Sequence, residues 1–336
     1  RLLRRWIGQP LLNVKSLTNR QNSVEWFHTN SLRRENITLL LKSVSDIERV
    51  ANKLLSLNAT PRDLSSLAQS LGIIPKLREI FLDSDDKKLI LELYENLKTH
   101  DFTIQQINRA IVEDPQITVG DGGVIKSGFS TELDNLRQSS DKSQNYIVSL
   151  QESERCKTGI KTLKVGYNRV FGYYIEVTKA QSRLVPENYI RRQTLTNAER
   201  YITTEIKEYE SKILSAKDRI KELELSLYKD LCEEISQDVQ NMLQTSRILA
   251  KIDVYASFAE AATQFNYIRP TLNNNSLIDI QSGRHPVVEK MVGSSKFVPN
   301  DIELSNEDTQ LIILTGPNMA GKSTYIRQVG IIVLMA

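Results

Sequence analysis

Apolar side chains recur at helical spacing through the first 145 residues of the chain. Leu64, Leu67 and Leu71 fall three or four positions apart, which is the period of an amphipathic α-helix. A second set with this spacing is Ile47, Val50, Leu54 and Leu57. Between helices, Thr60-Pro61 marks a helix start and Gly72 marks its end. This part is therefore predicted to be mostly helical.

A short segment with a different pattern follows, from Leu163 to Thr178 (LKVGYNRVFGYYIEVT). It is rich in Val, Ile, Tyr and Phe, and glycines interrupt it. Tyr173, Ile175 and Val177 share one face of an extended chain, which is typical of a strand or hairpin. The pattern predicts a small β-rich module that interrupts a helical protein.

The helical pattern then returns over a stretch without Gly or Pro, from Glu187 to Arg269. The sequence from Thr196 to Glu199 has the capping-box spacing of a helix start. Beyond it, apolar residues alternate steps of four and three, as in the seam of paired helices. They are Ile202, Ile206, Tyr209, Ile213, Ala216, Ile220, Leu223 and Leu227. We expect a helix from Glu199 to about Leu243, about 65 Å long at 1.5 Å per residue. Such a rod is typical of a lever, and an antiparallel bundle or a dimeric coiled coil would show the same seam.

Composition adds limits on the class of protein. The 336 residues are 40% hydrophobic and 25% charged, as expected for a core-forming protein of two or three domains. No segment approaches the ~18 to 20 consecutive apolar residues of a membrane span, and the N-terminus has no secretory signal. Cys156 and Cys232 show neither metal nor disulfide spacing, and three histidines argue against a multi-histidine metal site.

Positive charge is concentrated in one part of the chain. The net charge is +3, but the segment from Arg155 to Arg200 carries ten basic residues against three acidic ones. The basic residues are Arg155, Lys157, Lys161, Lys164, Arg169, Lys179, Arg183, Arg191, Arg192 and Arg200. A local excess of this kind indicates contact with a polyanion, although a solvated basic surface would look the same.

A phosphate-binding motif lies near the end of the sequence. The run from Gly316 to Ser323 (GPNMAGKS) matches G-x-x-x-x-G-K-[ST]. An apolar stretch, Gln310 to Thr315, precedes it and is predicted to be a buried parallel strand, and Thr324 to Ala336 is predicted to be a helix. In such loops backbone N–H groups bind phosphate. Lys322 would neutralise the β- and γ-phosphates, and Ser323 would offer a hydroxyl to Mg²⁺.

Hydrolysis needs more than this loop. Phosphoryl transfer also requires a carboxylate on the metal and a group that orients water. In a P-loop fold these groups come from later strands, and no later strand follows here. We therefore expect the binding half of a nucleotide site, with no catalytic residue in this chain and little or no ATPase activity from the chain alone.

Several motifs together resemble the MutS family of DNA mismatch-repair ATPases. The loop sequence TGPNMAGKSTYIRQVG and the upstream GRHPVVE resemble its ATPase domain. GYYIEVT and NYIRRQTLTNAERYITTEIKEYESKIL are similar to its DNA clamp and adjoining lever, and RLLRRWIGQPLLNVKSLTNRQNSVEWF to its central helical domain. The resemblance covers essentially the whole chain, and GYYIEV and GRHPVVE look closest to the bacterial branch.

The resemblance implies a fold class and a domain plan. The chain would be mostly α, with a small inserted β-rich clamp and a truncated C-terminal α/β P-loop ATPase portion of the ABC type. The implied domains are a discontinuous lever domain (1–145 and 206–265), the clamp (146–205) and the ATPase portion (266–336). The family's mismatch-reading N-terminal domain, connector and Walker B carboxylates would be absent.

The resemblance also implies functional residues and partners. The implied ATP or ADP site comprises Gly316, Pro317, Asn318, Met319, Ala320, Gly321, Lys322, Ser323 and Thr324, with Phe297 and Val298 against the adenine. Asn318 would sense the γ-phosphate, Ser323 would bind Mg²⁺ through ATP, and His285 is interpreted as structural. The implied partners are double-stranded DNA, a second copy joined through the ATPase domains, and a MutL-type protein. A bacterial chain would be cytoplasmic and nucleoid-associated, whereas a eukaryotic one would be nuclear or organellar.

Charge and polarity, rather than matched family positions, suggest which residues hold DNA. They are Lys161, Lys164, Asn168, Arg169, Arg191, Arg192 and Gln193. Our main hypothesis is an ATP-switched DNA clamp, a fragment of a mismatch-repair protein. The alternatives are a MutS-related junction-binding protein that reads no mismatch and an unrelated P-loop kinase with a helical extension.

Overall fold

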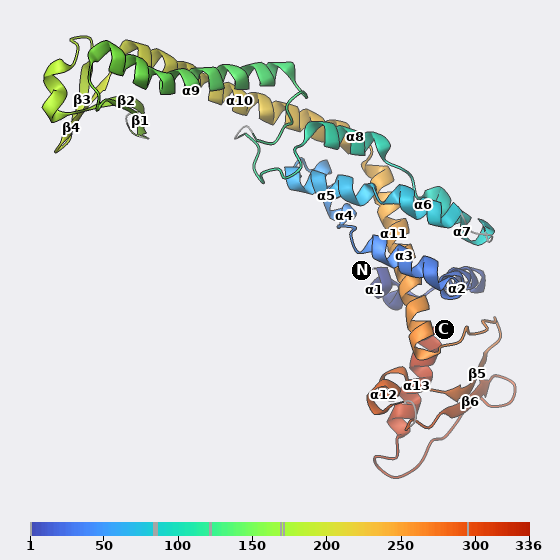
Figure 1. Cartoon of the computed structure of the whole chain (residues 1–336). Helices are drawn as coiled ribbons and strands as arrows, with labels where there is room; N and C mark the ends of the chain where they lie inside the picture. The colour runs from blue at the N-terminus through green and yellow to red at the C-terminus, as the bar shows by residue number, and fades with distance from the viewer. Residues whose placement is uncertain (1, 83–86, 121–122, 169, 171, 294–295) are drawn as a thin grey trace. The chain divides into compact units, whose positions relative to one another are not determined.

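The computed structural model describes residues 2–82, 87–120, 123–168, 170, 172–293 and 296–336 (Figure 1). The first nine helices are α1 (Leu2–Gly8), α2 (Val14–Thr29), α3 (Ser31–Leu41), α4 (Ile47–Leu55), α5 (Pro61–Leu71), α6 (Ile74–Leu82), α7 (Lys87–Asn96), α8 (Asp101–Ala110) and α9 (Thr131–Thr158). Then follow β1 (Lys164–Asn168), β2 (Gly172–Thr178), the 3₁₀ helix η1 (Lys179–Leu184), β3 (Ile190–Thr194), β4 (Ala198–Ile202), α10 (Thr204–Ser236) and α11 (Val239–Phe265). The last elements are β5 (Leu277–Gly283), α12 (Pro286–Val292), β6 (Asn300–Ser305) and α13 (Lys322–Met335).

The chain forms two compact units. Unit 1 comprises Arg1–Ser43, Ile74–Lys98 and Gln244–Ala336, and unit 2 comprises Val44–Ile73 and Thr99–Leu243. The structure is mostly helical and has two small antiparallel sheets among the described residues. This confirms the mostly α fold with an inserted β-rich module, while the exact domain boundaries given above stay a prediction.

Unit 1 is built around an aromatic core. The rings of Trp26 and Phe27 meet edge to face at 4.9 Å, and Phe81 from α6 packs against Trp26 at 5.7 Å. Arg34 is buried beside them, where it donates to the Phe27 carbonyl and to Glu260 of α11, each at 2.9 Å. A buried guanidinium needs such partners because an unpaired charge is costly away from water.

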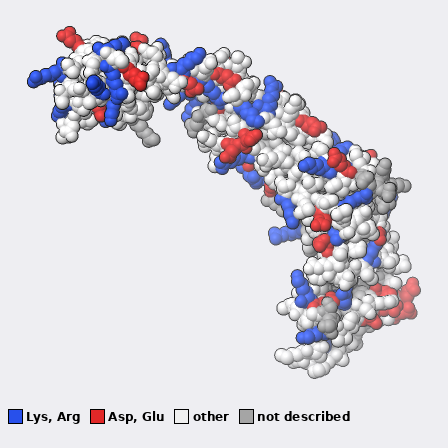
Figure 2. Space-filling model, viewed as in Figure 1, with Lys and Arg blue, Asp and Glu red and all other residues white. Residues whose placement is uncertain are grey.

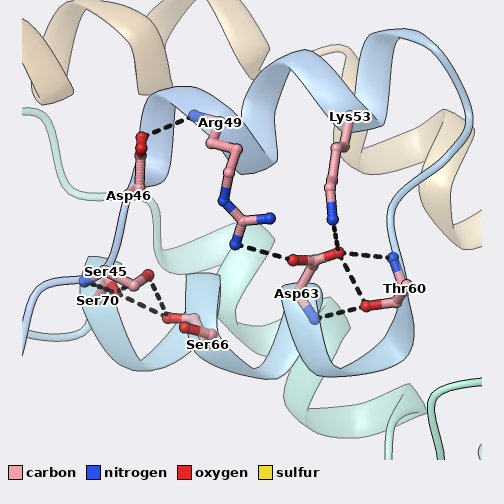
Figure 3. Close-up of polar contacts among 8 residues, drawn as sticks. All are labelled: Ser45, Asp46, Arg49, Lys53, Thr60, Asp63, Ser66 and Ser70. Carbon is pink, nitrogen blue, oxygen red and sulfur yellow. Dashed lines mark hydrogen bonds and ion pairs between the residues drawn. The ribbon is translucent and has the colours of Figure 1, made fainter.

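In unit 2, α4 and α5 are joined by the polar cluster of Figure 3. Thr60 and Asp63 form a reciprocal capping box at the start of α5, and Pro61 occupies its first turn. Arg49 and Lys53 of α4 donate to the same Asp63 carboxylate at 3.1 and 2.8 Å. The predicted helix start at Thr60-Pro61 is confirmed, as is the helix end at Gly72.

The two longest helices of unit 2, α9 and α10, run side by side (Figure 1). Ile206, Ile213 and Ile220 of the predicted seam are buried, and α9 contributes the buried Ile147 and Leu150. The four-stranded sheet lies at one end of this pair, and α4, α5 and α8 lie towards the other (Figure 1). The seam thus serves an antiparallel pairing within the chain.

The predicted bounds of the long helix were wrong at both ends. Residues 198–202 form β4 because they pair with β2 and β3, and this pairing overrides the capping-box signal at Thr196 to Glu199. The true cap is Thr203, whose hydroxyl accepts the N–H of Ile206. The helix ends at Ser236, and beyond it Asp238 accepts hydrogen bonds from Thr103 and Asn241 and contacts His100.

The ATPase-side prediction was also wrong in one element. Gln310 to Thr315 form no strand, and Leu311 and Ile313 are each 79% exposed. A parallel strand exists only where neighbouring strands accept and donate its hydrogen bonds. In the described part of unit 1 the strands β5 and β6 pair with each other instead. The predicted helix after the loop is confirmed as α13.

Candidate nucleic-acid interface and phosphate-binding loop

The four-stranded sheet of unit 2 has the order β1-β2-β4-β3, with all pairs antiparallel. Directly paired residues point to the same face of a sheet. Ile175 pairs with Val165 and Tyr201, so these residues share one face. Ile175 and Val177 are fully buried there in a core with α9 and α10 residues, which confirms the face assigned to them from the sequence. We call this the inner face.

We call the opposite face of the sheet the outer face. It carries a row of polar side chains. Glu176 pairs with Lys164 on one side and Arg200 on the other, and Arg200 pairs with Gln193. Arg200 donates to Glu176 at 2.9 Å and to Gln193 at 3.0 Å, and its guanidinium lies 4.2 Å from the centre of the Tyr174 ring. These contacts hold a cation at the centre of the outer face.

Three of the predicted DNA contacts are exposed cations. Lys161 lies in the turn between α9 and β1, Lys164 begins β1, and Arg192 lies where the register of β3 shifts. None of the three forms an ion pair with a residue that the structure describes. Figure 2 shows basic side chains gathered over this sheet. Since unpaired surface cations remain available to a ligand, these three are the strongest candidates for phosphate contact.

The other predicted contacts differ in their surroundings. Arg191 is the strand partner of Tyr201 and therefore lies on the inner face. Its guanidinium pairs with Glu199 at 3.3 Å. The Asn168 side chain accepts the N–H of Val170 and so caps the end of β1. Gln193 lies on the outer face and accepts from Arg200. Arg169 lies outside the described residues.

Sequence reasoning missed the role of Arg200 and Tyr174 at this face. Arg200 was counted in the basic segment but not among the predicted contacts, because charge alone does not show which face a residue occupies. The alternation along β2 and β4 could have found it, since Arg200 lies one position from the buried Tyr201.

Two tyrosine–glutamate hydrogen bonds connect the sheet to α9 and α9 to α10. Tyr189 donates to Glu154 of α9, and Tyr146 donates to Glu205 at the start of α10. The hydrogen bond to Glu205, together with burial, raises the pKa of Tyr146 to about 12. Lys157 also donates to Glu154, at 2.9 Å. The bond from Tyr189, directly before β3, thus holds the sheet on α9, and the bond from Tyr146 joins α9 to α10.

The motif Gly316 to Ser323 forms an exposed turn at the start of α13. Gly316, Met319 and Gly321 have φ of 149°, 67° and 85°, in the region that favours glycine. The Lys322 ammonium donates back to the carbonyls of Gly316 and Pro317, the latter at 2.6 Å. Lys322 and Ser323 occupy the first positions of α13, where backbone N–H groups lack helical partners.

These features fit a phosphate group. The helix N-terminus supplies free N–H donors and positive potential, and Lys322 already reaches across the turn. An added Cβ at Gly321 would meet open space, so φ rather than crowding requires glycine there. Phe297 is half-buried and Val298 is exposed, in the segment between α12 and β6. Asn318 lies within the turn, and Thr324 lies in the first turn of α13.

His285 has a structural role at the start of α12. It is buried, and its Nδ1 accepts the N–H groups of Val287 and Val288 at 3.3 Å each. The neighbouring Arg284 pairs with Glu289 at 3.0 Å. These contacts agree with the structural interpretation of the Gly-Arg-His-Pro segment.

The fold defines a mostly helical protein with a basic four-stranded sheet at the end of a long helix pair. Comparison with protein families shows more: the chain belongs to the MutS family. Residues 1–259 match MutS domain III, and residues 312–336 match MutS domain V. This membership contradicts the alternative of an unrelated P-loop kinase.

Curated relatives match along the whole chain. The chain is 43% identical over 336 residues to the DNA mismatch repair protein MutS of Alkaliphilus oremlandii, covering 100% of this chain and 38% of that protein. It is 46% identical to the protein of that name from Acetivibrio thermocellus, again with 38% of the relative covered. The relative from Caldicellulosiruptor bescii is 45% identical, with 39% covered. The chain thus spans less than half the length of these relatives.

Proposed function

We propose that this chain provides the DNA backbone grip and the ATP phosphate-binding loop of a protein that acts in DNA mismatch repair. The observation that carries the proposal is the set of unpaired cations around the sheet, in a chain of the MutS family. The relatives carry the mismatch-repair name, which favours this reading over a junction-binding member of the family.

The sheet suits contact with phosphates rather than bases. Lys161 lies in a turn, and Lys164 and Arg192 lie on the edge strands β1 and β3, so their charges are spread along the surface of the sheet. Phosphate contacts position a protein on the duplex but carry no sequence information. Such binding weakens steeply with salt because it releases counterions. The grip proposed here is therefore non-specific, and recognition of a mismatch would belong to other parts of the full protein.

In nucleotide binding, the residues of the turn before α13 would hold the phosphates. Backbone N–H groups of Asn318 to Lys322 would bind phosphate oxygens, and the Lys322 ammonium would exchange its carbonyl partners for the β- and γ-phosphates. Ser323 would bind a Mg²⁺ ion held by ATP or ADP, and Phe297 and Val298 would contact the adenine. Bound Mg²⁺ would neutralise developing negative charge on the phosphates. ATPase activity of the full protein is part of this proposal.

Partners follow from the same assignment. We propose double-stranded DNA as the ligand of the sheet, with dimerisation through the ATPase domains and a MutL-type protein as further partners. We place the full protein in the bacterial cytoplasm with the nucleoid. Among the described residues no helix is long and apolar enough to cross a membrane.

Neutralising the three unpaired cations tests the DNA grip. We expect the variant Lys161→Gln/Lys164→Gln/Arg192→Gln to bind a fluorescent duplex more weakly than the wild-type chain in anisotropy titrations at several salt concentrations. The slope of log K against log salt should shrink by about 0.9 for each phosphate that the variant no longer neutralises. Wild-type affinity and slope in a folded triple variant would contradict the proposal.

A further inference from the structure

A buried carboxylate of α10 lies against the start of β2. Glu210 is 7% exposed, and its Oε1 accepts the backbone N–H of Tyr173 at 2.9 Å. Its Oε2 accepts from the Lys207 ammonium one turn earlier on α10. An acidic side chain is thus buried beneath the most basic part of the chain, in contact with backbone rather than with a basic side chain of the sheet.

Gly172 and Glu210 fit together sterically. A Cβ at Gly172 would lie 1.6 Å from Oε1 of Glu210, so the carboxylate occupies the space that any side chain at 172 would need. Gly172 also has a φ of 78°, in the left-handed region. This backbone turns the Tyr173 N–H towards α10, and a residue with a side chain would adopt this conformation only under strain.

The bond between Tyr173 and Glu210 holds the start of β2, where few other backbone hydrogen bonds are made. The pairing of β2 with β4 begins at Ile175, whereas the pairing of β1 with β2 extends to Asn168 and Gly172. In the described strand pairs, the end of the hairpin from Gly172 to Tyr174 is therefore bonded to β1 alone. A two-stranded ribbon is marginally stable in water. The bond from Tyr173 to Glu210 ties this projecting end to the lever helix.

We propose that Glu210 is a positioning residue for DNA binding: it fixes the projecting end of the β1–β2 hairpin on α10. This rests on the proposed function, in which the sheet grips DNA. The end of the hairpin presents the exposed Tyr167 and Val170 together with Asn168. Fixing it before DNA arrives lowers the entropic cost of ordering it on binding.

Replacing Glu210 would change the affinity for DNA in opposite directions through its charge and through its positioning role. A negative charge beside a polyanion site repels phosphate, so neutralisation alone would strengthen DNA binding. Loss of the Tyr173 bond would instead release the hairpin and weaken binding. Glutamine separates the two effects, because its amide oxygen still accepts a hydrogen bond while its charge is gone.

The test uses the 336-residue chain in hydrogen exchange and DNA-binding measurements. In Glu210→Ala we expect the Tyr173 amide to exchange at least about tenfold faster, as for loss of a bond to a charged acceptor. Duplex affinity should fall several-fold with a nearly unchanged salt slope. In Glu210→Gln we expect slow exchange and affinity equal to or tighter than that of the wild-type chain. Glu208→Ala, an exposed acidic residue on the same helix, is the matched control and should change neither measurement.

Three outcomes would overturn the proposal. A wild-type chain that binds no duplex would refute the proposed function and the positioning role with it. Duplex binding that is equal or tighter in Glu210→Ala would refute the positioning role alone, as would unchanged exchange at Tyr173. If Glu210→Ala does not fold, Gly172→Ala provides the second variant, because its Cβ must displace the carboxylate. It should show the same faster exchange and weaker DNA binding.

Discussion

The ammonium of Lys53 lies 2.8 Å from Oδ2 of Asp63, so the last turn of α4 is bonded to the first turn of α5. Burial opposes ionisation of Asp63, but hydrogen bonds from Lys53 and from Thr60 outweigh it and lower the pKa to about 2. The carboxylate is therefore an anchor for both helices rather than a simple cap.

This pair predicts a pH-dependent stability. Because the pKa of Asp63 is lower in the folded state than its ordinary value of 3.8, the ionised group stabilises the fold above about pH 4, and that contribution is lost as the pH falls towards about 2. We expect Asp63→Asn to lower the free energy of unfolding by about 2 kcal/mol at pH 7. The difference should shrink at about pH 3 in urea titrations.

Asp114→Asn is the control for this prediction. Asp114 is also in unit 2 but its side chain is 95% exposed, with only a distant Arg62 partner at 3.8 Å. It should alter the unfolding free energy by less than about 0.5 kcal/mol at either pH. Equal losses of unfolding free energy in Asp63→Asn and Asp114→Asn would show that the contacts of Asp63 do not stabilise the fold more than an exposed carboxylate does.

A second prediction concerns Glu224, a fully buried carboxylate of α10. It accepts the N–H groups of Gly120, Val124 and Ile125, and it pairs with Arg137 of α9 at 3.1 Å. Glu224→Ala leaves a half-buried guanidinium and three backbone donors without this acceptor, so we expect a loss of about 3 to 5 kcal/mol in urea unfolding. Glu222→Ala, on the exposed side of the helix, should cost under about 0.5 kcal/mol.

The features that the sequence predicted correctly are those that depend on residues close together in the chain. Thr60-Pro61 and Gly72 act within one helix, and the alternation of Tyr173, Ile175 and Val177 reflects one strand. The start of α10 could not be found in this way. Residues 198–202 pair with a strand more than ten residues away in sequence, and these long-range bonds outweigh a local cap at Thr196.

The site was predictable in its charge but not in its geometry. The basic segment identified the sheet, yet the irregularity between Arg191 and Gln193 decides which side chains of β3 face the same way. A one-residue slip exchanges the faces of a strand, and no residue type in that segment signals it. The pairing of Arg191 with Glu199 follows from strand register and so stayed hidden as well.

A third prediction concerns DNA binding and follows from the register shift between Arg191 and Gln193 in β3. Arg192 is exposed without an ion pair among the described residues, whereas Arg191 already pairs with Glu199. We expect Arg192→Gln to weaken duplex binding more than Arg191→Gln, and to reduce the salt slope by about 0.9. Lys217→Gln, on the exposed side of α10, should leave the slope unchanged. Equal effects of the two arginines in anisotropy titrations would contradict this ranking.

The last prediction concerns Lys322 and the nucleotide. Its ammonium now bonds the carbonyls of Gly316 and Pro317, and we expect it to move to phosphate oxygens when ATP binds. Lys322→Ala removes a charge-assisted hydrogen bond, so binding of a fluorescent ATP analogue should weaken by at least about tenfold. Binding of the corresponding analogue of adenosine, which has no phosphate, should be equally weak in the wild-type chain and in the variant.

Lys290→Ala is the matched control for Lys322→Ala. Lys290 is an exposed lysine of α12 in the same unit, and its ammonium lies over the Phe265 ring at 5.5 Å. Its replacement removes one positive charge without touching the turn before α13, so ATP affinity should stay near that of the wild-type chain. If both lysine variants weaken ATP binding equally, the effect is one of net charge, and the assignment of Lys322 to the phosphates is wrong.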